Sequence, residues 1–113
     1  MAGGNPTKLL RPLERAPEQE LFEPLLQNRD LLLERIVSYG HVTPEGQWYD
    51  QDRDEWVMLL AGAASLRFED QEGLVSMEPG DAVHIAAHRR HRVEWTQPGI
   101  QTIWLALHFR GGD

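Results

Sequence analysis

The sequence contains no cysteine, which excludes disulfide bonds, thiolate metal sites and cysteine nucleophiles. It has no apolar run long enough to cross a membrane, and its first ten residues lack the apolar core of a signal peptide. No internal repeat or low-complexity segment is evident. These absences remove the usual marks of a small secreted scaffold, and a cytoplasmic protein is the default expectation.

Positive charge is scarce as well, since 11 lysines and arginines stand against 18 acidic residues and give a net charge of −7. Nucleic-acid binders usually carry a basic face, and the bases here are scattered apart from a short cluster at Arg89, Arg90 and Arg92. A solvated loop that pairs with the excess acids is favoured for this cluster over an anion site. We expect no nucleic-acid partner and no attraction to anionic membranes.

The length of 113 residues corresponds to one domain, and a hydrophobic fraction of 41% is enough for a core. Pro6, Pro12 and Pro17 break any helix near the start, while Pro17 and the acids after it favour a turn or short helix that Pro24 limits. The sequence therefore predicts an N-terminal arm over residues 1–30 and a domain over residues 31–110.

Short segments rich in apolar and β-branched residues alternate with turn signals after residue 30. The turn signals include Asp70 to Gly73, Pro79-Gly80-Asp81 and Pro98-Gly99. The predicted strands cover residues 33–39, 55–61, 64–69, 74–77, 82–85, 91–96 and 100–109. This spacing is typical of an all-β protein, a small antiparallel sandwich or barrel.

Two stretches resemble the paired motifs of the cupin superfamily. Glu55 and Gly62 are separated by six residues, as in the first motif, and Pro79-Gly80-Asp81 followed by His91 is similar to the second. The resemblance covers roughly residues 30–110. It implies a double-stranded β-helix, or jelly-roll, and a pocket that contains Glu55 and His91.

The first motif also departs from the family, in which three histidines and a glutamate hold a divalent metal. Tyr49 and Gln51 stand where the two motif histidines are expected with one spacing, and Trp48 and Asp50 with the other. The resemblance then implies a metal set of Glu55, His91, Gln51 and Tyr49, for iron, manganese, nickel or zinc, that is weakly bound or absent. Phenol and amide oxygens are weaker ligands than imidazole at neutral pH.

A metal-free reading starts from strand alternation, which places Glu55 on one face with Val57 and Leu59, opposite Trp56 and Met58. The same alternation places His91, Val93 and Trp95 on one face of their predicted strand. A glutamate and a histidine that face an apolar interior can serve as a general acid and base, so Glu55 and His91 are the candidate catalytic residues. They can equally form a structural ion pair that needs no substrate.

Further pocket residues follow from parity and position. In an extended strand, Tyr49 and Gln51 lie on the same face as Glu55, and Trp104 lies on the same face as His108, because an even number of positions separates them. His41 lies near the expected pocket mouth. His84 and His88 are expected at the surface. The outward-facing stripe of Trp56, Met58 and Leu60 predicts a cover, supplied by the N-terminal arm or by a second subunit, because soluble monomers seldom expose such patches. The family resemblance also implies a homodimer.

These residues are compatible with three different functions. The first is a small enzyme, of the isomerase, dehydratase or metal-dependent oxygenase type, that acts on a small polar metabolite. The second is a ligand-binding or sensing module without turnover and with a vestigial metal site. The third is a structural role with a vestigial pocket.

Overall fold

The structure is a computed structural model that describes residues 4–110, and every strand lies within that range. No helix occurs among these residues. Seven of the eight strands match the predicted segments to within two residues at each end. The strands are β1 (Leu21–Gln27), β2 (Leu31–Ser38), β3 (Asp54–Ala61), β4 (Ala64–Phe68), β5 (Val75–Met77), β6 (Ala82–Ile85), β7 (His91–Thr96) and β8 (Thr102–Phe109).

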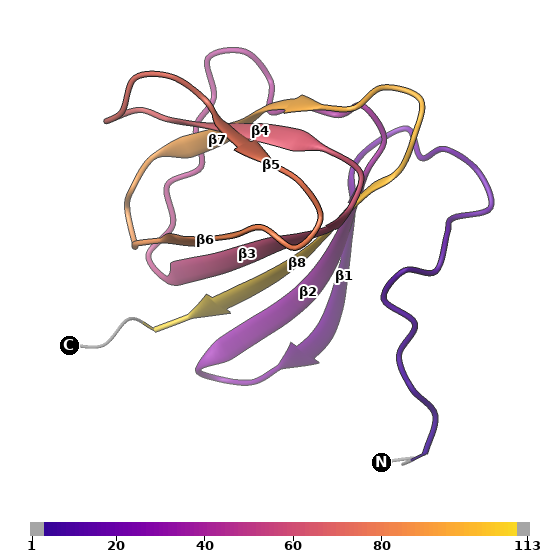
Figure 1. The fold of residues 1–113 in the computed structure, drawn as a ribbon. Helices are drawn as coiled ribbons and strands as arrows, with labels where there is room; N and C mark the ends of the chain where they lie inside the picture. The colour runs from indigo at the N-terminus through magenta and orange to yellow at the C-terminus, as the bar shows by residue number, and fades with distance from the viewer. Residues whose placement is uncertain (1–3, 111–113) are drawn as a thin grey trace.

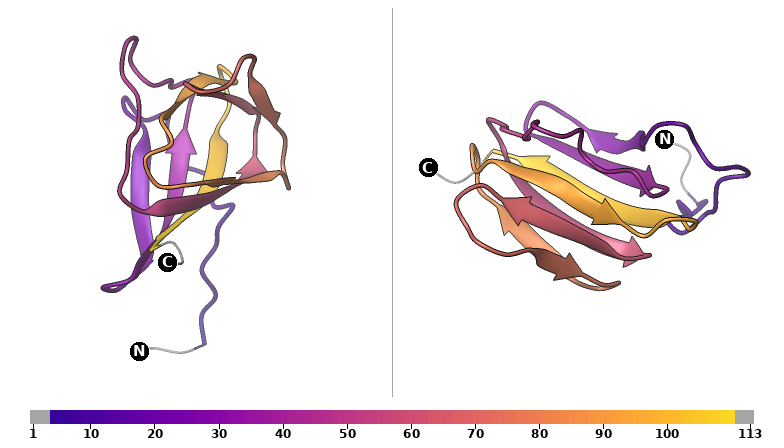
Figure 2. Two further views of the ribbon diagram at one scale, coloured as in Figure 1. Left: turned by 90° about the vertical axis from the view of Figure 1, so that its left-hand side faces the viewer. Right: turned by 90° about the horizontal axis from the view of Figure 1, so that it is seen from above.

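The strands form two antiparallel sheets that face each other (Figures 1 and 2). One sheet has five strands in the order β1-β2-β8-β3-β6, and the other has three in the order β5-β4-β7. Because β3 and β4 follow each other in sequence but lie in different sheets, the chain crosses between layers as in a jelly-roll. The all-β architecture expected from the turn spacing and the jelly-roll implied by the cupin resemblance are therefore confirmed, as two packed sheets.

The core lies between the sheets and follows the expected alternation. On β3, Val57 and Leu59 are buried, while Trp56 and Met58 on the opposite face are half-buried. Leu66 of β4 and Trp104 of β8 complete the contact between layers. The apolar side chains thus form a core between the sheets, and some of them border the inward-facing polar residues.

The turn from β3 to β4 depends on Gly62, the glycine of the first motif. Its φ of +87° lies in the left-handed region. A Cβ at this position would lie 2.7 Å from the Cα atom of Thr102 and 2.9 Å from the carbonyl oxygen of Gln101. Only glycine therefore allows the turn to pack directly against the start of β8.

The predicted N-terminal arm is shorter than expected, since residues 21–27 form β1 at the edge of the larger sheet instead of a turn or short helix. Pro24 is compatible with an edge strand because its missing N–H group is not needed by a second neighbour. Before β1 the arm is fixed by Arg35, whose side chain is almost fully buried and binds the backbone oxygens of Leu9 and Arg11 and the carboxylate of Glu23. Residues 1–3 of the predicted arm lie outside the described range.

A bulge in β7 corrects one predicted face. Leu66 pairs with Val93, but its neighbour Ser65 pairs with Trp95, so Glu94 is the extra residue. Trp95 consequently leaves the face that His91 and Val93 share and is 42% exposed. The face predicted for Trp95 was therefore wrong. No helix in the described part of the chain is long and apolar enough to cross a membrane.

Candidate functional site

A pocket of about 120 Å³ opens between the two sheets and is lined by residues of both. Polar residues from both layers face it, and apolar side chains form its floor. Its lining consists of Glu20, Phe22, Glu34, Ile36, Tyr49, Gln51, Glu55, Val57, Leu66, Ile85, His91, Val93, Trp104 and His108.

Glu55 of β3 and His91 of β7 approach each other across this pocket from opposite sheets. Glu55 Oε1 lies 3.5 Å from His91 Nε2, and the two residues are 8% and 5% exposed. His91 Nδ1 lies 2.9 Å from the carbonyl oxygen of Arg89, which can only accept a hydrogen bond. Nδ1 therefore carries a proton, and Nε2 is the nitrogen that faces Glu55 and the pocket.

A chain of side-chain hydrogen bonds links Glu55 to the second histidine of the pocket. The amide of Gln51 donates to Glu55 Oε1 over 3.5 Å, and its oxygen lies 3.0 Å from Nδ1 of His108. Nε2 of His108 lies 3.0 Å from the carboxylate of Glu34. Each ring nitrogen of His108 thus lies within hydrogen-bond distance of a side-chain oxygen.

The contacts of Glu55 to His91 and to Gln51 are both at the long limit for hydrogen bonds. Its carboxylate is thus buried, faces an open pocket and is held loosely. Acid and base groups in free enzymes often show such long contacts, which shorten when a ligand fills the site. The geometry permits Glu55 to take up a proton and His91 to supply one at adjacent positions of a bound molecule.

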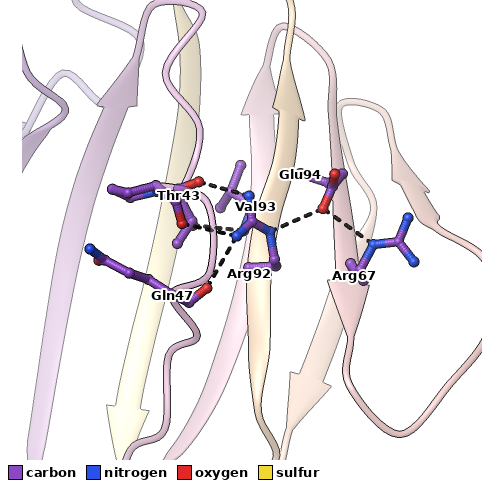
Figure 3. Close-up of polar contacts among 7 residues, drawn as sticks. Thr43, Gln47, Arg67, Arg92, Val93 and Glu94 are labelled. Atoms are coloured by element: carbon purple, nitrogen blue, oxygen red, sulfur yellow. Dashed lines mark hydrogen bonds and ion pairs between the residues drawn. The ribbon is translucent and has the colours of Figure 1, made fainter.

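Tyr49 and Gln51 reach the pocket because the long segment before β3 is fastened to β7 (Figure 3). Arg92 donates to the carbonyl oxygens of Thr43, Pro44 and Gln47 over 2.8 to 3.2 Å, and the hydroxyl of Thr43 accepts from the backbone of Val93 at 2.9 Å. Glu94 holds the same guanidinium from the other side at 3.0 Å. Arg92 of the basic cluster therefore holds the segment before β3 against β7 and does not face the pocket.

Two pocket groups have altered acidities. Burial raises the pKa of Glu20, although the hydroxyl of Ser38 donates to its carboxylate and lowers it in part. Burial also raises the pKa of the Tyr49 phenol, and the charges of Glu20 and Glu55 raise it further. Burial is the largest cause of both shifts, and the carboxylates of Glu20 and Glu55 add to it at Tyr49.

The structure brings together most of the residues that the sequence singled out. Those that line the pocket are Glu55, His91, Tyr49, Gln51, Trp104 and His108. His41 does not line it: its Nδ1 accepts from the backbone of Tyr39, and its Nε2 lies 3.0 Å from the carbonyl oxygen of Glu18. As expected for surface residues, His84 and His88 are exposed, with Asp54 and Asp50 as partners.

Glu20 and Glu34 are pocket residues that the sequence analysis missed. Glu34 lies on the same face of β2 as Ile36. A charged residue on an otherwise apolar strand face was the signal that could have predicted it as a pocket residue. Glu20 precedes β1, in a proline-containing segment that was predicted to be part of the N-terminal arm. No sequence signal placed it beside the barrel interior.

The donor atoms at this site fit a firmly held metal poorly. Residues 4–110 contain no group of three or more histidines, aspartates or glutamates arranged to hold a metal ion. Glu55 and His91 offer two good donors, while both nitrogens of His108 are engaged and the raised pKa of Tyr49 keeps it a neutral phenol. The metal set of Glu55, His91, Gln51 and Tyr49 stays a prediction, and no chemical step below depends on it.

Comparison with solved structures identifies the class of protein. The fold superimposes on a cupin superfamily protein from Desulfitobacterium hafniense DCB-2 with a TM-score of 0.72, at 19% identity over 88% of this chain and 84% of that one. A polyketide cyclase, RemF from Streptomyces resistomycificus, matches with a TM-score of 0.69, at 19% identity over 86% and 70% of the respective chains. These two matches show the shared fold.

A nearer relative is a protein from Ralstonia eutropha JMP134, whose name assigns it provisionally as a mannose-6-phosphate isomerase. It is 41% identical to this chain, with a TM-score of 0.91 over 96% of this chain and all 100% of that one. No family model matches the sequence, and no curated protein does. The chain has a cupin-like fold.

Proposed function

We propose that this protein is a small cupin enzyme that binds a small polar metabolite between its sheets and moves a proton within it. In this proposal Glu55 removes a proton from a hydroxyl-bearing carbon next to a carbonyl group, and His91, in its imidazolium form, gives its Nε2 proton to the carbonyl oxygen, so that an enediol forms. Nε2 of His91 then takes the proton of the other enediol hydroxyl while Glu55 returns its proton to the former carbonyl carbon, which completes an isomerisation and restores both residues. Gln51 and Tyr49 orient the polar groups of the substrate.

The observation that carries the proposal is the Glu55–His91 pair. The two groups come from different sheets, are almost fully buried, and have their reactive atoms 3.5 Å apart at the wall of an open pocket. A carboxylate and an imidazole in this relation can act on adjacent atoms of one substrate. The isomerase assignment in the name of the Ralstonia relative agrees with this reaction type.

The test is exchange of substrate hydrogen with solvent. Small hydroxyaldehydes, ketones and amino acids are first screened for binding by ligand-observed NMR, and the binders are then incubated with the protein in D₂O. We expect deuterium to enter a binder next to its carbonyl group. Glu55→Gln and His91→Asn should slow this exchange by about 100-fold or more.

Glu72→Gln is the matched control, since Glu72 is exposed in the turn between β4 and β5. Exchange that persists in Glu55→Gln would contradict the assignment of the base. Binders that depend on Glu55 but never exchange would overturn the enzyme proposal and support the alternative, a binding or sensing module. Failure to find any binder sensitive to Glu55→Gln would contradict both.

A further inference from the structure

The charge of the pocket wall restricts the ligands that it can accept. Three carboxylates face the pocket, from Glu20, Glu34 and Glu55, together with the two imidazoles of His91 and His108. Within the described part of the chain, the lining contains neither arginine nor lysine. Even with both histidines charged, the carboxylates outnumber the cations.

We propose that the pocket selects a small organic cation, an amine with a compact apolar body, and rejects phosphorylated and carboxylate ligands. This inference rests on the proposed function in that it concerns the same pocket. It adds the charge class of the ligand, which the proton-transfer step alone leaves open.

The three carboxylates differ in how far the protein itself compensates them. Glu34 has His108 at 3.0 Å, and Glu55 has His91 at 3.5 Å. The hydrogen-bond partner of Glu20 is the neutral hydroxyl of Ser38. Burial and, to a smaller extent, the charge of Glu34 raise the pKa of Glu20, whereas Ser38 and the charge of His41 lower it only in part, so a bound cation would supply the remaining compensation.

Aromatic rings supply the second element of a site for an amine. Phe22 and Tyr49 line the pocket while remaining 47% and 38% exposed, so they stand at its opening, and Trp104 lies buried within. The faces of aromatic rings attract cations, most strongly for Trp and where solvent is excluded. Carboxylates together with aromatic faces match an ammonium group better than they match an anion.

Phosphate recognition normally uses arginine forks, lysines or a helix N-terminus. The arginines nearest in sequence to His91 are engaged elsewhere: Arg89 with Asp70, Arg90 with Glu69, and Arg92 with Glu94. The size of the pocket points the same way. A cavity of about 150 Å³ accommodates benzene, so a pocket of about 120 Å³ is small for a phosphorylated hexose.

The test compares ligands of similar size and different charge. Dissociation constants are measured by protein-observed NMR, in the presence of EDTA, for cyclopentylamine, cyclopentanol, cyclobutanecarboxylate and mannose 6-phosphate. We expect cyclopentylamine to bind about tenfold more tightly than cyclopentanol, an energy difference of about 1.4 kcal/mol. The carboxylate and the phosphate should not bind in the pocket.

Glu20→Gln and Glu34→Gln should each reduce the preference for the amine several-fold, and Glu72→Gln should leave it unchanged. Equal binding of amine and alcohol, tighter binding of either anion, or an amine preference that survives both pocket variants would overturn the inference. This failure is distinct from failure of the proposed function. Cation selection fails when pocket ligands bind with the wrong charge preference, whereas the proposed function fails when no pocket ligand depends on Glu55 or exchanges hydrogen.

Discussion

The backbones of Tyr49 and His91 exchange two hydrogen bonds, of 2.7 and 3.2 Å, and their side-chain rings stack with centroids 5.6 Å apart. This isolated bridge ties the segment before β3 to the first residue of β7, far along the chain. It places Tyr49 over His91 and brings Gln51 to Glu55. The site is thus assembled from a loop and two sheets, each of which the sequence presents separately.

Tyr49 should ionise at a higher pH than an ordinary tyrosine. The chain has two tyrosines, so the difference in alkaline absorbance titration between wild type and Tyr49→Phe isolates this phenol. Its midpoint should lie above 10, because burial and the charges of Glu20 and Glu55 raise the pKa. Glu55→Gln should lower the midpoint, and Tyr39→Phe should leave it in place. A midpoint at or below 10 would show that burial and the charges of Glu20 and Glu55 do not act on this phenol as described.

Glu20 should make the folding free energy depend on pH. Its pKa in the folded protein is raised above the ordinary value of 4.5, chiefly by burial, so the folded state binds its proton more tightly than the unfolded state does. Its stabilising contribution is complete below pH 4.5 and is lost as the pH rises through the folded pKa. Relative to wild type, Glu20→Gln should therefore gain stability as the pH rises from acid to neutral. Urea denaturation at several pH values checks this, and a Glu20→Gln variant that loses stability relative to wild type as the pH rises would contradict it.

Arg35 should contribute to folding through the N-terminal arm. Arg35→Ala removes a buried charge, takes one of two arginine partners from Glu23 and leaves the carbonyl oxygens of Leu9 and Arg11 without this donor, so a loss of about 3 kcal/mol is expected. Arg11→Ala is the control, because Arg11 forms an exposed ion pair with the same Glu23 and should cost less than about 1 kcal/mol. Urea denaturation measures both, and equal losses would show that burial of Arg35 does not matter.

Gly62→Ala and Gly73→Ala form a second matched pair. Both glycines have a positive φ, of 87° and 83°, but only at Gly62 would a Cβ meet the backbone of Thr102 and Gln101. Gly73→Ala should cost about 1 kcal/mol for the left-handed conformation alone. Gly62→Ala should cost more by several kcal/mol or prevent folding. If thermal denaturation showed the same small loss in both variants, the close approach of this turn to β8 would be wrong.

The sequence predicted much of the fold because local signals specify it. Turn residues bound the strands, and alternation around Glu55 correctly divided the buried from the outward residues of β3. Features that depend on how the strands pair with one another were not predicted. β1 was hidden by Pro24, which an edge strand tolerates, and Trp95 turned outward because of a bulge that is visible only in the pairing with β4.

The same distinction applies to the candidate site. Motif spacing and strand parity brought forward Glu55, His91 and Gln51, which do converge. His41 does not line the pocket, because a position in a loop near the expected mouth does not fix the direction of the side chain; its ring instead accepts a hydrogen bond from the backbone of Tyr39. Glu20 and the pairing of Glu34 with His108 depend on strand order, which no local pattern encodes.

Side-chain ¹⁵N NMR of the histidines tests the central claim, that His91 presents Nε2 to Glu55 as a proton-transfer partner. In neutral His91 the account predicts a proton on Nδ1, directed at the carbonyl oxygen of Arg89, and an unprotonated Nε2. The Nε2 resonance should move in Glu55→Gln and should not move in Glu72→Gln. A proton on Nε2 with a bare Nδ1, or an Nε2 resonance indifferent to Glu55→Gln, would contradict the account.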